Sequence, residues 1–564
     1  MLSDARRVPP GTTIAADLCV IGAGAAGITI ARELAGSGLR VLVLESGGEE
    51  LDPRTQSLYR GRSTGIPYFA LDGTRLRFLG GSTNHWGGVC RPFDPLDFEP
   101  RDWIPFSGWP IRKRDLDRYY GPASAIVGLS SDDFSAESWE QRDHFSPLDL
   151  GPRTEPRVAQ IVDPDSRSFG IRYRSEIEAA EDVDLYLHAN ATEIEADPAG
   201  GAVARVRVAT LSGNRFSVKA RSFVLAAGGI ENPRLLLASN RQLPRGLGNQ
   251  NDLVGRFFTE HPRFVAGLVA PSDAEIGVGF YGVHHVGDAD IQGYVALPEP
   301  VQREEELVDV QVFVHPTYDE RFAAAFESDD VESLRAVSRG QGTIDEFGTD
   351  LMNVVADLTT FREYTIPGAP LPVPYPEIVE RTLEGGDELR DHIPDLLGDI
   401  AADGYRRLNG SVPLQALELS TRLDQAPNPE SRITLSRSRD ALGMPRAQLE
   451  WRLSEIDRRS AARATEILAS GFSAAGLGRV RIVFDDDEAG WPDDLAGGNH
   501  HIGTTRMSDD AKRGVVDRDC RVHGLANLFV AGSSVFATGG SSTPTLTIVA
   551  LALRLADHLR GTLR

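Results

Sequence analysis

Short apolar runs near the start of the chain predict buried strands. Residues 17–21 form one such run and residues 41–44 another, and continuous apolar runs of this length are typical of strands buried on both faces. A helical stretch lies between them and ends at Leu34, before the stop signals Gly36 and Gly38. The order of strand, glycine turn, helix and strand predicts a βαβ unit that opens a parallel sheet.

Two later segments have the same character. Residues 223–227 read as a buried strand followed by two glycines, and residues 527–532 as another, followed by a helix over 544–559. Pro233 is expected in the first turn of a helix that continues through 235–239, where a proline is tolerated. These segments predict further strands of the first sheet.

The middle of the chain, about 262–490, is different in kind and shows no internal repeat. Strand-like runs are predicted at 308–314, 418–420 and 433–436, helical runs at 387–401 and 455–470, and a proline-rich loop at 366–376. We therefore expect a split dinucleotide-binding domain with a second domain inserted. The predicted parts of the first domain are residues 14–150 (with a loop-dominated segment, 51–110), 185–262 and 491–564, and the inserted domain is 263–490.

Composition and charge narrow the class of protein. The 564 residues are 41% hydrophobic and 25% charged, which is enough for a core and gives no case for disorder. Lys and Arg total 59 against 82 Asp and Glu, a net charge of −23, which argues against nucleic acid or an anionic membrane as the main partner. We expect neither a Sec nor a twin-arginine signal at the start, since no apolar stretch follows the two arginines, and we see no apolar run long enough to span a membrane. The prediction is a cytoplasmic protein.

Cysteine and histidine usage gives no metal site. The three cysteines form no CxxC pair and are too few for a disulfide framework. His261, His284 and His285 are interpreted as ordinary core or surface residues, since no further ligands fall at coordinating spacing. The prediction is therefore that no metal is bound.

The glycine turn carries the first candidate chemistry. Gly22, Gly24 and Gly27 fit a dinucleotide-binding turn, in which the glycines allow the tight turn, the approach of a pyrophosphate and close helix packing. Glu45 ends the second strand, where an acid meets the adenosine ribose hydroxyls and disfavours a 2′-phosphate. The alternative is a cluster of glycines that serves packing alone.

Four further stretches carry a family resemblance: 80–88 (GGSTNHWGG), 225–237 (LAAGGIENPRLLL), 499–507 (NHHIGTTRM) and 527–547. In this order, after an N-terminal glycine turn, the chain resembles the glucose–methanol–choline (GMC) flavoprotein oxidoreductases. It is similar to the branch that holds pyranose oxidases, fructose dehydrogenases and bacterial sugar 3-oxidases. The resemblance is good over about 15–110, 185–262 and 495–564 and thin across the inserted domain.

The resemblance implies an α/β fold with a split Rossmann-like FAD-binding domain and an inserted α+β substrate domain whose antiparallel sheet lies over the flavin. It implies FAD as cofactor and oxidation of a CH–OH group of a sugar, glycoside or related alcohol to a carbonyl. In this family a base takes the hydroxyl proton while hydride passes to flavin N5, and O₂ or a quinone or other carrier reoxidises the flavin. Homo-oligomerisation is left open. The alternatives are a non-redox lyase or isomerase on the same scaffold, and a binding protein with a decayed site.

The same resemblance assigns two catalytic candidates. The family has a histidine six positions before the arginine of its Gly-Thr-x-Arg-Met segment; this matches His500, before Arg506, and not His501. An imidazole is partly neutral at neutral pH and can accept a proton. Where the family has Asn or His before a Pro-Thr-Leu-Thr segment, this chain has Thr543, whose hydroxyl cannot serve as a base.

The remaining site residues are expected beside the cofactor. His85 stands where pyranose oxidases have a histidine linked covalently to the flavin, although Asn84 intervenes in the motif; whether FAD is linked here is left open. Gly80 and Gly81 would let the main chain approach the cofactor. Gly532 and Thr545 are expected near the ribityl–pyrophosphate chain and the pyrimidine end of the flavin, respectively.

Overall fold

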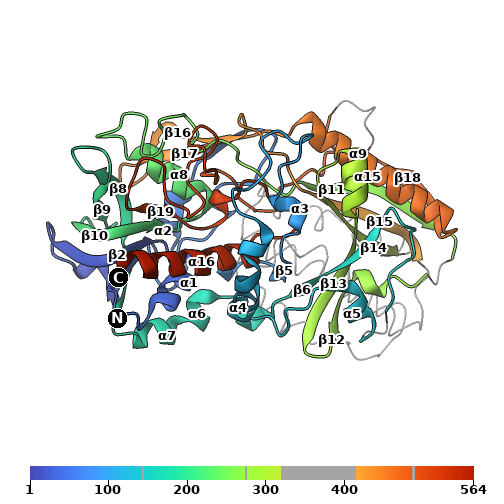
Figure 1. The fold of residues 1–564 in the computed structure, drawn as a ribbon, viewed down its shortest axis with the longest axis horizontal. Coiled ribbons are helices and arrows are strands. Elements are labelled where there is room, and N and C mark those ends of the chain that lie inside the picture. Colours follow the sequence, from blue (N-terminus) through green and yellow to red (C-terminus); the bar gives the residue numbers. More distant parts are fainter. Residues whose placement is uncertain (143–144, 274–275, 319–413, 485–489) are drawn as a thin grey trace, which may run out of the picture.

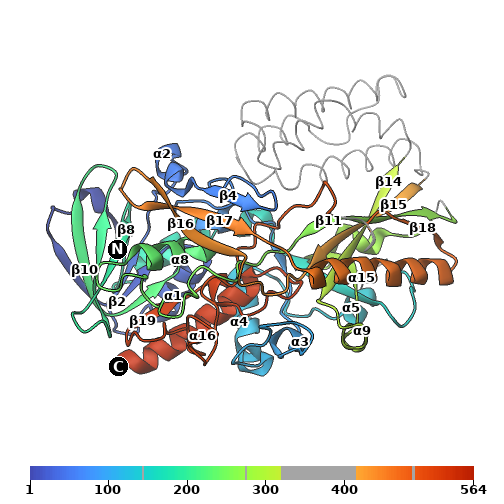
Figure 2. The same ribbon diagram turned by 90° about the horizontal axis from the view of Figure 1, so that it is seen from above.

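A parallel sheet and an antiparallel sheet lie side by side along the long axis of the molecule (Figure 1). The structure is a computed structural model that describes residues 1–142, 145–273, 276–318, 414–484 and 490–564. The predicted proline-rich loop (366–376) and the predicted helix over 387–401 lie outside these ranges. Both chain termini lie at the end of the molecule that holds the parallel sheet (Figures 1 and 2).

The first sheet is built around the predicted βαβ unit. Its strands run in the order β1-β7-β3-β2-β10-β9-β8, with β19 also paired to β10. All neighbours are parallel except the pairs β10–β9 and β9–β8. The strands are β1 (Leu2–Asp4), β2 (Thr13–Ile21), β3 (Val41–Leu44), β7 (Val183–Leu187), β8 (Asn190–Ala196), β9 (Val203–Ala209), β10 (Arg215–Leu225) and β19 (Leu528–Val530).

Parallel pairing brings the carboxyl ends of four strands to one edge of this sheet. Strands β3, β2, β10 and β19 are neighbours there, and each is buried along its last three residues. Helix α1 (Ala25–Leu34) packs on α16 (Thr545–Leu563), which also packs on α4 (Asp117–Val127). Because βαβ connections cover the faces of the sheet, the open crevice lies at the carboxyl edge.

The second sheet has the order β18-β11-β15-β14-β13-β6-β5, with β12 paired to β13, and every strand pair in it is antiparallel. Its strands β5 and β6 precede residue 263, so the sheet draws on segments outside the predicted inserted domain. The strands are β5 (Val89–Cys90), β6 (Glu155–Ile161), β11 (Arg263–Pro271), β12 (Val283–Val286), β13 (Ala289–Ala296), β14 (Val310–Tyr318), β15 (Leu414–Leu423) and β18 (Gly478–Ile482).

A long helix covers the second sheet, and a small third sheet lies on the side of the molecule that holds the parallel sheet. Helix α15 (Glu455–Ala474) runs along β11, β14, β15 and β18 (Figure 2). It begins with a capping box, in which Ser454 and Asp457 satisfy the first free amides. The third sheet has the order β16 (Arg432–Arg439), β17 (Pro445–Trp451) and β4 (Arg62–Gly65), and α8 (Gly228–Ala238) packs against β16 and β17.

The structure corrects the predicted start of the helix after β10. Helix α8 begins at Gly228, so Pro233 is its sixth residue and not in its first turn. A proline in that place leaves the carbonyl four residues earlier, at Gly229, without its helical donor. The hydroxyl of Thr504 donates a hydrogen bond of 2.6 Å to this carbonyl. A distant side chain therefore replaces the missing backbone bond, which local sequence could not reveal.

The arrangement is the expected α/β fold, with a Rossmann-like parallel sheet and a second, antiparallel sheet. Within the described ranges, none of the helices combines the length and the apolar character that crossing a lipid bilayer requires.

Candidate active site

A large cleft opens at the carboxyl edge of the parallel sheet and extends to the antiparallel sheet. It measures about 1660 Å³, counting the part open to solvent. Nine of the twelve predicted site residues line it: Gly22, Gly24, Glu45, Gly81, His85, His500, Gly532, Thr543 and Thr545. The other three, Gly27, Gly80 and Asn84, are not among the lining residues.

The glycine turn after β2 is required by the backbone itself. Gly22 has φ of +108°, and a Cβ there would lie 2.5 Å from the carbonyl oxygen of Ala226. A Cβ on Gly27 would lie 1.9 Å from the carbonyl oxygen of Gly22. Since both contacts are with backbone, no side chain can move aside to relieve them. Gly27 therefore serves the close packing of helix α1 on the turn.

Glu45 ties the end of β3 to the glycine turn. It is buried, and its carboxylate accepts hydrogen bonds from the amides of Ala23 (3.0 Å) and Gly47 (2.8 Å). The carboxylate therefore has a fixed position at the cleft wall. Among the described lining residues it is the only acidic one.

Three helix N-termini reach the same cleft. The first residues of α1, α8 and α16 all line it, and the N-cap residue of each of these helices makes no side-chain cap bond in the described part of the chain. The free amides and the positive end of the helix dipole make such termini favourable places for negative charge. The cleft is thus suited to a ligand with phosphate groups.

Several lining groups are left without partners by the protein. A Cβ at Gly532 would meet no atom within 4 Å, and one at Gly24 only the carbonyl oxygen of Gly80 at 3.8 Å. Arg75 keeps Nε and Nη1 buried and unpaired among the described residues, as does His501 its Nε2. Open backbone cradles and orphaned buried donors and acceptors are the features that a large, polar, phosphate-bearing ligand would satisfy.

His500 lies in the loop after β18, at the end of the cleft near the antiparallel sheet, where Arg263 and Arg422 also line it. Burial, together with the positive charges of Arg422 and Arg263, holds the pKa of His500 well below its usual value. The imidazole is therefore neutral at neutral pH. A neutral imidazole facing a cleft can accept a proton.

His261 makes a direct contact with His500 that the sequence did not indicate. The two Nδ1 atoms lie 2.7 Å apart, and Nε2 of His261 lies 2.6 Å from the carbonyl oxygen of Gly540. His261 is fully buried, and burial lowers its pKa to about 3. The ordinary core role predicted for His261 is therefore too simple, because this residue holds the candidate base.

His501, which does not match the family's histidine, lines the cleft as well. Its ring packs near Tyr68 and Phe258, with ring centroids 6.2 and 5.9 Å away. Burial lowers its pKa to about 3. The two imidazoles differ in that only His500 is bonded to His261.

Thr543 and Asn84 use their side chains within the protein. The Thr543 hydroxyl donates a hydrogen bond to the carbonyl of Val89, so its proton is not available to a ligand. The Asn84 amide donates to the carbonyls of Leu79 (3.0 Å) and Gly81 (2.9 Å) and accepts from Ser168. These bonds shape the 80–85 turn and leave His85, the next residue, at the cleft wall.

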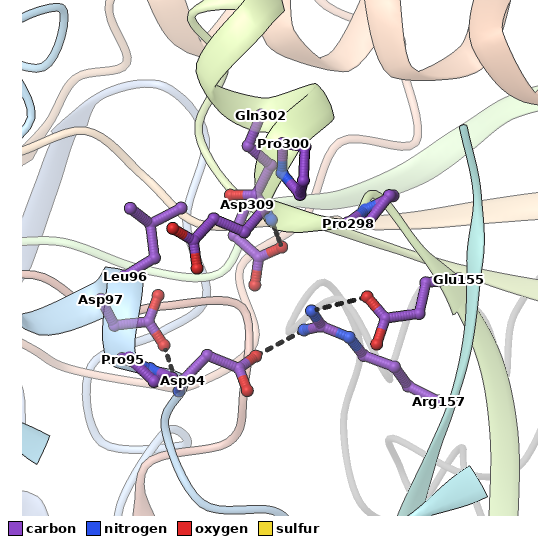
Figure 3. Close-up of a pocket in the computed structure, with 11 residues that line it drawn as sticks. Asp94, Pro95, Leu96, Asp97, Glu155, Arg157, Pro298, Pro300, Gln302 and Asp309 are labelled. Atoms are coloured by element: carbon purple, nitrogen blue, oxygen red, sulfur yellow. Dashed lines mark hydrogen bonds and ion pairs between the residues drawn. The ribbon is translucent and has the colours of Figure 1, made fainter. Parts of the chain in front are cut away.

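A second pocket is rich in carboxylates (Figure 3), and two of its acids lie against the loop that carries Gly540. Ser541 donates to the carboxylate of Asp309, and the carboxylate of Asp97 stands 2.7 Å from where a Cβ of Gly540 would be. These acids therefore support the loop. Nowhere in the described ranges do three or more His, Cys, Asp or Glu side chains form a group able to hold a metal ion.

Sequence reasoning missed part of the cleft wall. Arg75 precedes Gly80 by five residues in the same predicted loop, and that proximity was the one available signal. Arg263 and Arg422 come from strands β11 and β15 of the second sheet, and Tyr59 from a short helical turn. No local pattern distinguishes the last three residues from ordinary core or surface positions.

The chain is similar to several known proteins. Residues 17–248 match the family described as FAD dependent oxidoreductase, and residues 427–552 match the family described as GMC oxidoreductase. The chain is 22% identical to the fructose dehydrogenase large subunit of Gluconobacter japonicus, over 98% of this chain and 99% of that protein. It is 24% identical to 2-methyl-1,2-propanediol dehydrogenase of Mycolicibacterium austroafricanum, over 96% and 95%. A solved structure, pyridoxine 4-oxidase from Mesorbium loti, aligns with a TM-score of 0.49 at 16% identity, over 96% and 99% of the two chains.

The two family matches cover both ends of the cleft. The first spans the glycine turn, Glu45 and the start of α8, and the second spans His500, Thr543 and the start of α16. The orphaned donors, the open glycine cradles and the helix N-termini suit the pyrophosphate and ring system of FAD. With an FAD dependent oxidoreductase match over 17–248 and a GMC oxidoreductase match over 427–552, the chain is an FAD-dependent oxidoreductase with a GMC-type C-terminal segment.

Proposed function

We propose that this enzyme oxidises a CH–OH group of a sugar, glycoside or related alcohol to a carbonyl, with His500 as the base. FAD, when bound, supplies the two-electron acceptor that takes the hydride from the carbinol carbon. The hydroxyl proton goes to the free ring nitrogen of His500. Bond balance requires both transfers, since the carbinol carbon loses a hydride and its oxygen loses a proton.

The observation that carries this proposal is the place of the His500 imidazole in the cleft wall. A base must be unprotonated before the reaction, and the lowered pKa of His500 meets that condition at neutral pH. Nδ1 of His500 is occupied by His261, so Nε2 is the nitrogen left to meet a substrate. Thr543 cannot take this role because it has no basic atom.

For the cofactor, we propose a division of labour along the cleft. The amides at the start of α1 would hold the pyrophosphate, and Glu45 would accept hydrogen bonds from the adenosine ribose hydroxyls. Gly81, Gly532 and Thr545 would border the rest of FAD. The place of His85 in the cleft wall is compatible with contact to the flavin, whether or not a covalent link forms.

The names of the relatives favour redox chemistry over the alternative of a lyase or isomerase. The two relatives described above are named as dehydrogenases, one of fructose and one of a diol. We therefore propose a polyol or sugar as substrate. The electron acceptor, O₂ or a quinone, stays a prediction.

The test is anaerobic reduction of the bound flavin by a panel of alcohols. Reduction is measured as the loss of the visible absorption band that makes oxidised flavin yellow. The panel is D-fructose, D-glucose, methyl β-D-glucoside and 2-methyl-1,2-propanediol. We expect at least one of these to bleach the flavin, and His500→Ala to slow bleaching by about 10²-fold or more, the scale of a lost general base. His285→Ala is the control, since it removes an exposed imidazole that is not among the residues lining the cleft, and its rate should match that of the wild type.

Two outcomes would count against the proposal. Flavin that keeps its colour with a broad panel of alcohols would favour the lyase alternative. A normal rate for His500→Ala would remove His500 from the mechanism.

Acid precipitation answers the separate question of a covalent link. Linked flavin would stay in the pellet of the wild type and would be released from His85→Ala.

A further inference from the structure

Three polar groups stand in line behind the candidate base. Nδ1 of His500 is 2.7 Å from Nδ1 of His261, and Nε2 of His261 is 2.6 Å from the carbonyl oxygen of Gly540. Both distances are within hydrogen-bond range. Each contact must contain one proton, because two lone pairs at these distances would repel.

The carbonyl of Gly540 determines where the protons are. A carbonyl oxygen only accepts, so Nε2 of His261 must carry a hydrogen and donate it. A neutral imidazole has one N–H, which leaves Nδ1 of His261 as an acceptor. Nδ1 of His500 must then be the donor, and Nε2 of His500 keeps the lone pair.

The other two proton arrangements are disfavoured. If His261 carried its proton on Nδ1, the bare Nε2 would face the Gly540 carbonyl at 2.6 Å, lone pair against lone pair. If His261 were doubly protonated, a charge would be buried in a residue that is 0% exposed. Burial makes this charged form unfavourable at neutral pH.

A buried carboxylate fixes the distance between the two histidines. Oε2 of Glu260 accepts the backbone amides of His261 (3.0 Å), Gly498 (2.9 Å) and His500 (3.1 Å). Its other oxygen accepts the hydroxyl of Tyr68. One carboxylate therefore holds the backbones of both histidines, which are 239 residues apart in the chain.

The acceptor at the far end is equally fixed. The loop of Gly540 is held by hydrogen bonds from Thr538 to the carbonyl of Asp97 and from Ser541 to the carboxylate of Asp309. These two acids lie in the pocket of Figure 3. The Gly540 carbonyl is thus a rigid acceptor for His261.

We infer that His261 is a positioning residue that sets the tautomer of His500, so that Nε2 of His500 presents its lone pair to the substrate. The contact between His261 and His500 also stabilises His500 after it has accepted the proton. When Nε2 of His500 takes a proton, Nδ1–H remains bonded to His261, and this acceptor stabilises the imidazolium. The inference rests on the proposed role of His500 as base.

Two substitutions separate this role from simple support of the loop. In His261→Asn, the amide oxygen takes the place of Nδ1 and can accept from His500, while the bond to Gly540 is lost. In His261→Gln, the amide nitrogen takes the place of Nε2 and keeps the bond to Gly540, while the acceptor for His500 is lost. If His261 sets the tautomer, Asn is the better replacement, and if it only supports the loop, Gln is.

The experiment measures anaerobic flavin reduction by the best reductant of the panel above, with flavin content and melting temperature as checks of folding. We expect His261→Asn to stay within about fivefold of the wild-type rate and His261→Gln to lose at least about tenfold. The double variant His261→Gln/His500→Ala should be no slower than His500→Ala alone, because a positioning residue has no effect once the base is gone.

A second readout needs no substrate. Long-range ¹H–¹⁵N spectra of the FAD-loaded enzyme labelled with ¹⁵N-histidine report which ring nitrogen carries the proton, and His500→Ala identifies the signals. We expect a pyrrole-type Nδ1 and a pyridine-type Nε2 for His500. The opposite tautomer would overturn the inference.

The outcomes distinguish the two proposals. A slow His500→Ala with an unaffected His261→Gln, or with His261→Asn as slow as His261→Gln, overturns the positioning role and leaves the base role standing. A double variant with additive losses has the same meaning. A normal rate for His500→Ala refutes the proposed function and, with it, the positioning inference.

Discussion

The hydroxyl of Thr504 is expected to stabilise the fold by replacing a backbone hydrogen bond that Pro233 cannot make. Pro233 is the sixth residue of α8, and the carbonyl it leaves without a donor belongs to Gly229. Thr504 is 0% exposed and donates to this carbonyl at 2.6 Å. Thr504→Val keeps the shape of the side chain but removes the donor.

The magnitude follows from burial. Gly229 is buried, so the carbonyl has no water to turn to once the hydroxyl is gone. An unsatisfied buried acceptor costs about 1–3 kcal/mol of the free energy of unfolding. Val fills nearly the same volume as Thr, so little of this loss comes from packing.

A double-mutant cycle tests the mechanism. Pro233→Ala restores an N–H that can donate to Gly229, so Thr504→Val should cost about 1 kcal/mol less in this background than in the wild type. The assay is urea unfolding followed by flavin fluorescence, with the concentration of free FAD held constant, since bound ligand adds to apparent stability. Thr504→Ser, which keeps the hydroxyl, is the control.

The reasoning would be refuted by a cycle without coupling. If Thr504→Val costs the same with and without Pro233, then the hydroxyl does not replace the helical donor. A loss for Thr504→Ser as large as for Thr504→Val would assign the effect to the methyl group instead.

Three further predictions follow from single contacts. Gly27→Ala should abolish FAD incorporation, because its Cβ would stand 1.9 Å from the Gly22 carbonyl oxygen, whereas Gly561→Ala, at an open helical position, should retain normal flavin absorbance. The rate of flavin reduction should be constant from pH 8 to about 6.5 and fall only below, because the pKa of His500 lies below its usual value; a limb centred above pH 7 in stopped-flow measurements would contradict this. Burial raises the pKa of Asp424 to about 7, so the folded state holds a proton there that the unfolded state releases near pH 4, and stability is lost progressively as pH rises from about 4 to about 7. Melting temperatures measured from pH 5 to 8 should decline less in Asp424→Asn than in the wild type.

The parts of the fold that the sequence predicts are those with a local signal. The strand over 17–21 and the helix ending at Leu34 lie within β2 and α1 as expected, because an apolar run and a glycine turn report directly on local burial. The helix over 455–470 lies within α15 for the same reason. The family motifs predict the cofactor, FAD, because they follow one another along the chain in the order that the family has.

What the sequence could not predict depends on contacts between distant segments. The first turn assigned to Pro233 was wrong, because the donor that permits a proline deeper in α8 comes from Thr504, 275 residues away. The hydrogen bond from Thr543 to Val89 joins residues that are 454 positions apart. No periodicity within either segment carries this information, since it arises from how the two sheets are placed.

The candidate base shows why the placement of the sheets decides the chemistry. Glu260 and His261 come just before β11 of the antiparallel sheet, whereas Gly540 precedes α16 on the parallel side. The hydrogen bonds of His261 therefore cross between the two lobes, while the glycine turn and Glu45 belong to the parallel lobe alone. Changes in the line from His500 to Gly540 should thus impair catalysis while FAD still binds, and changes in the glycine turn should remove FAD. A His261→Gln protein that is slow and fully yellow, beside a colourless Gly27→Ala protein, is the pair of phenotypes that this division requires.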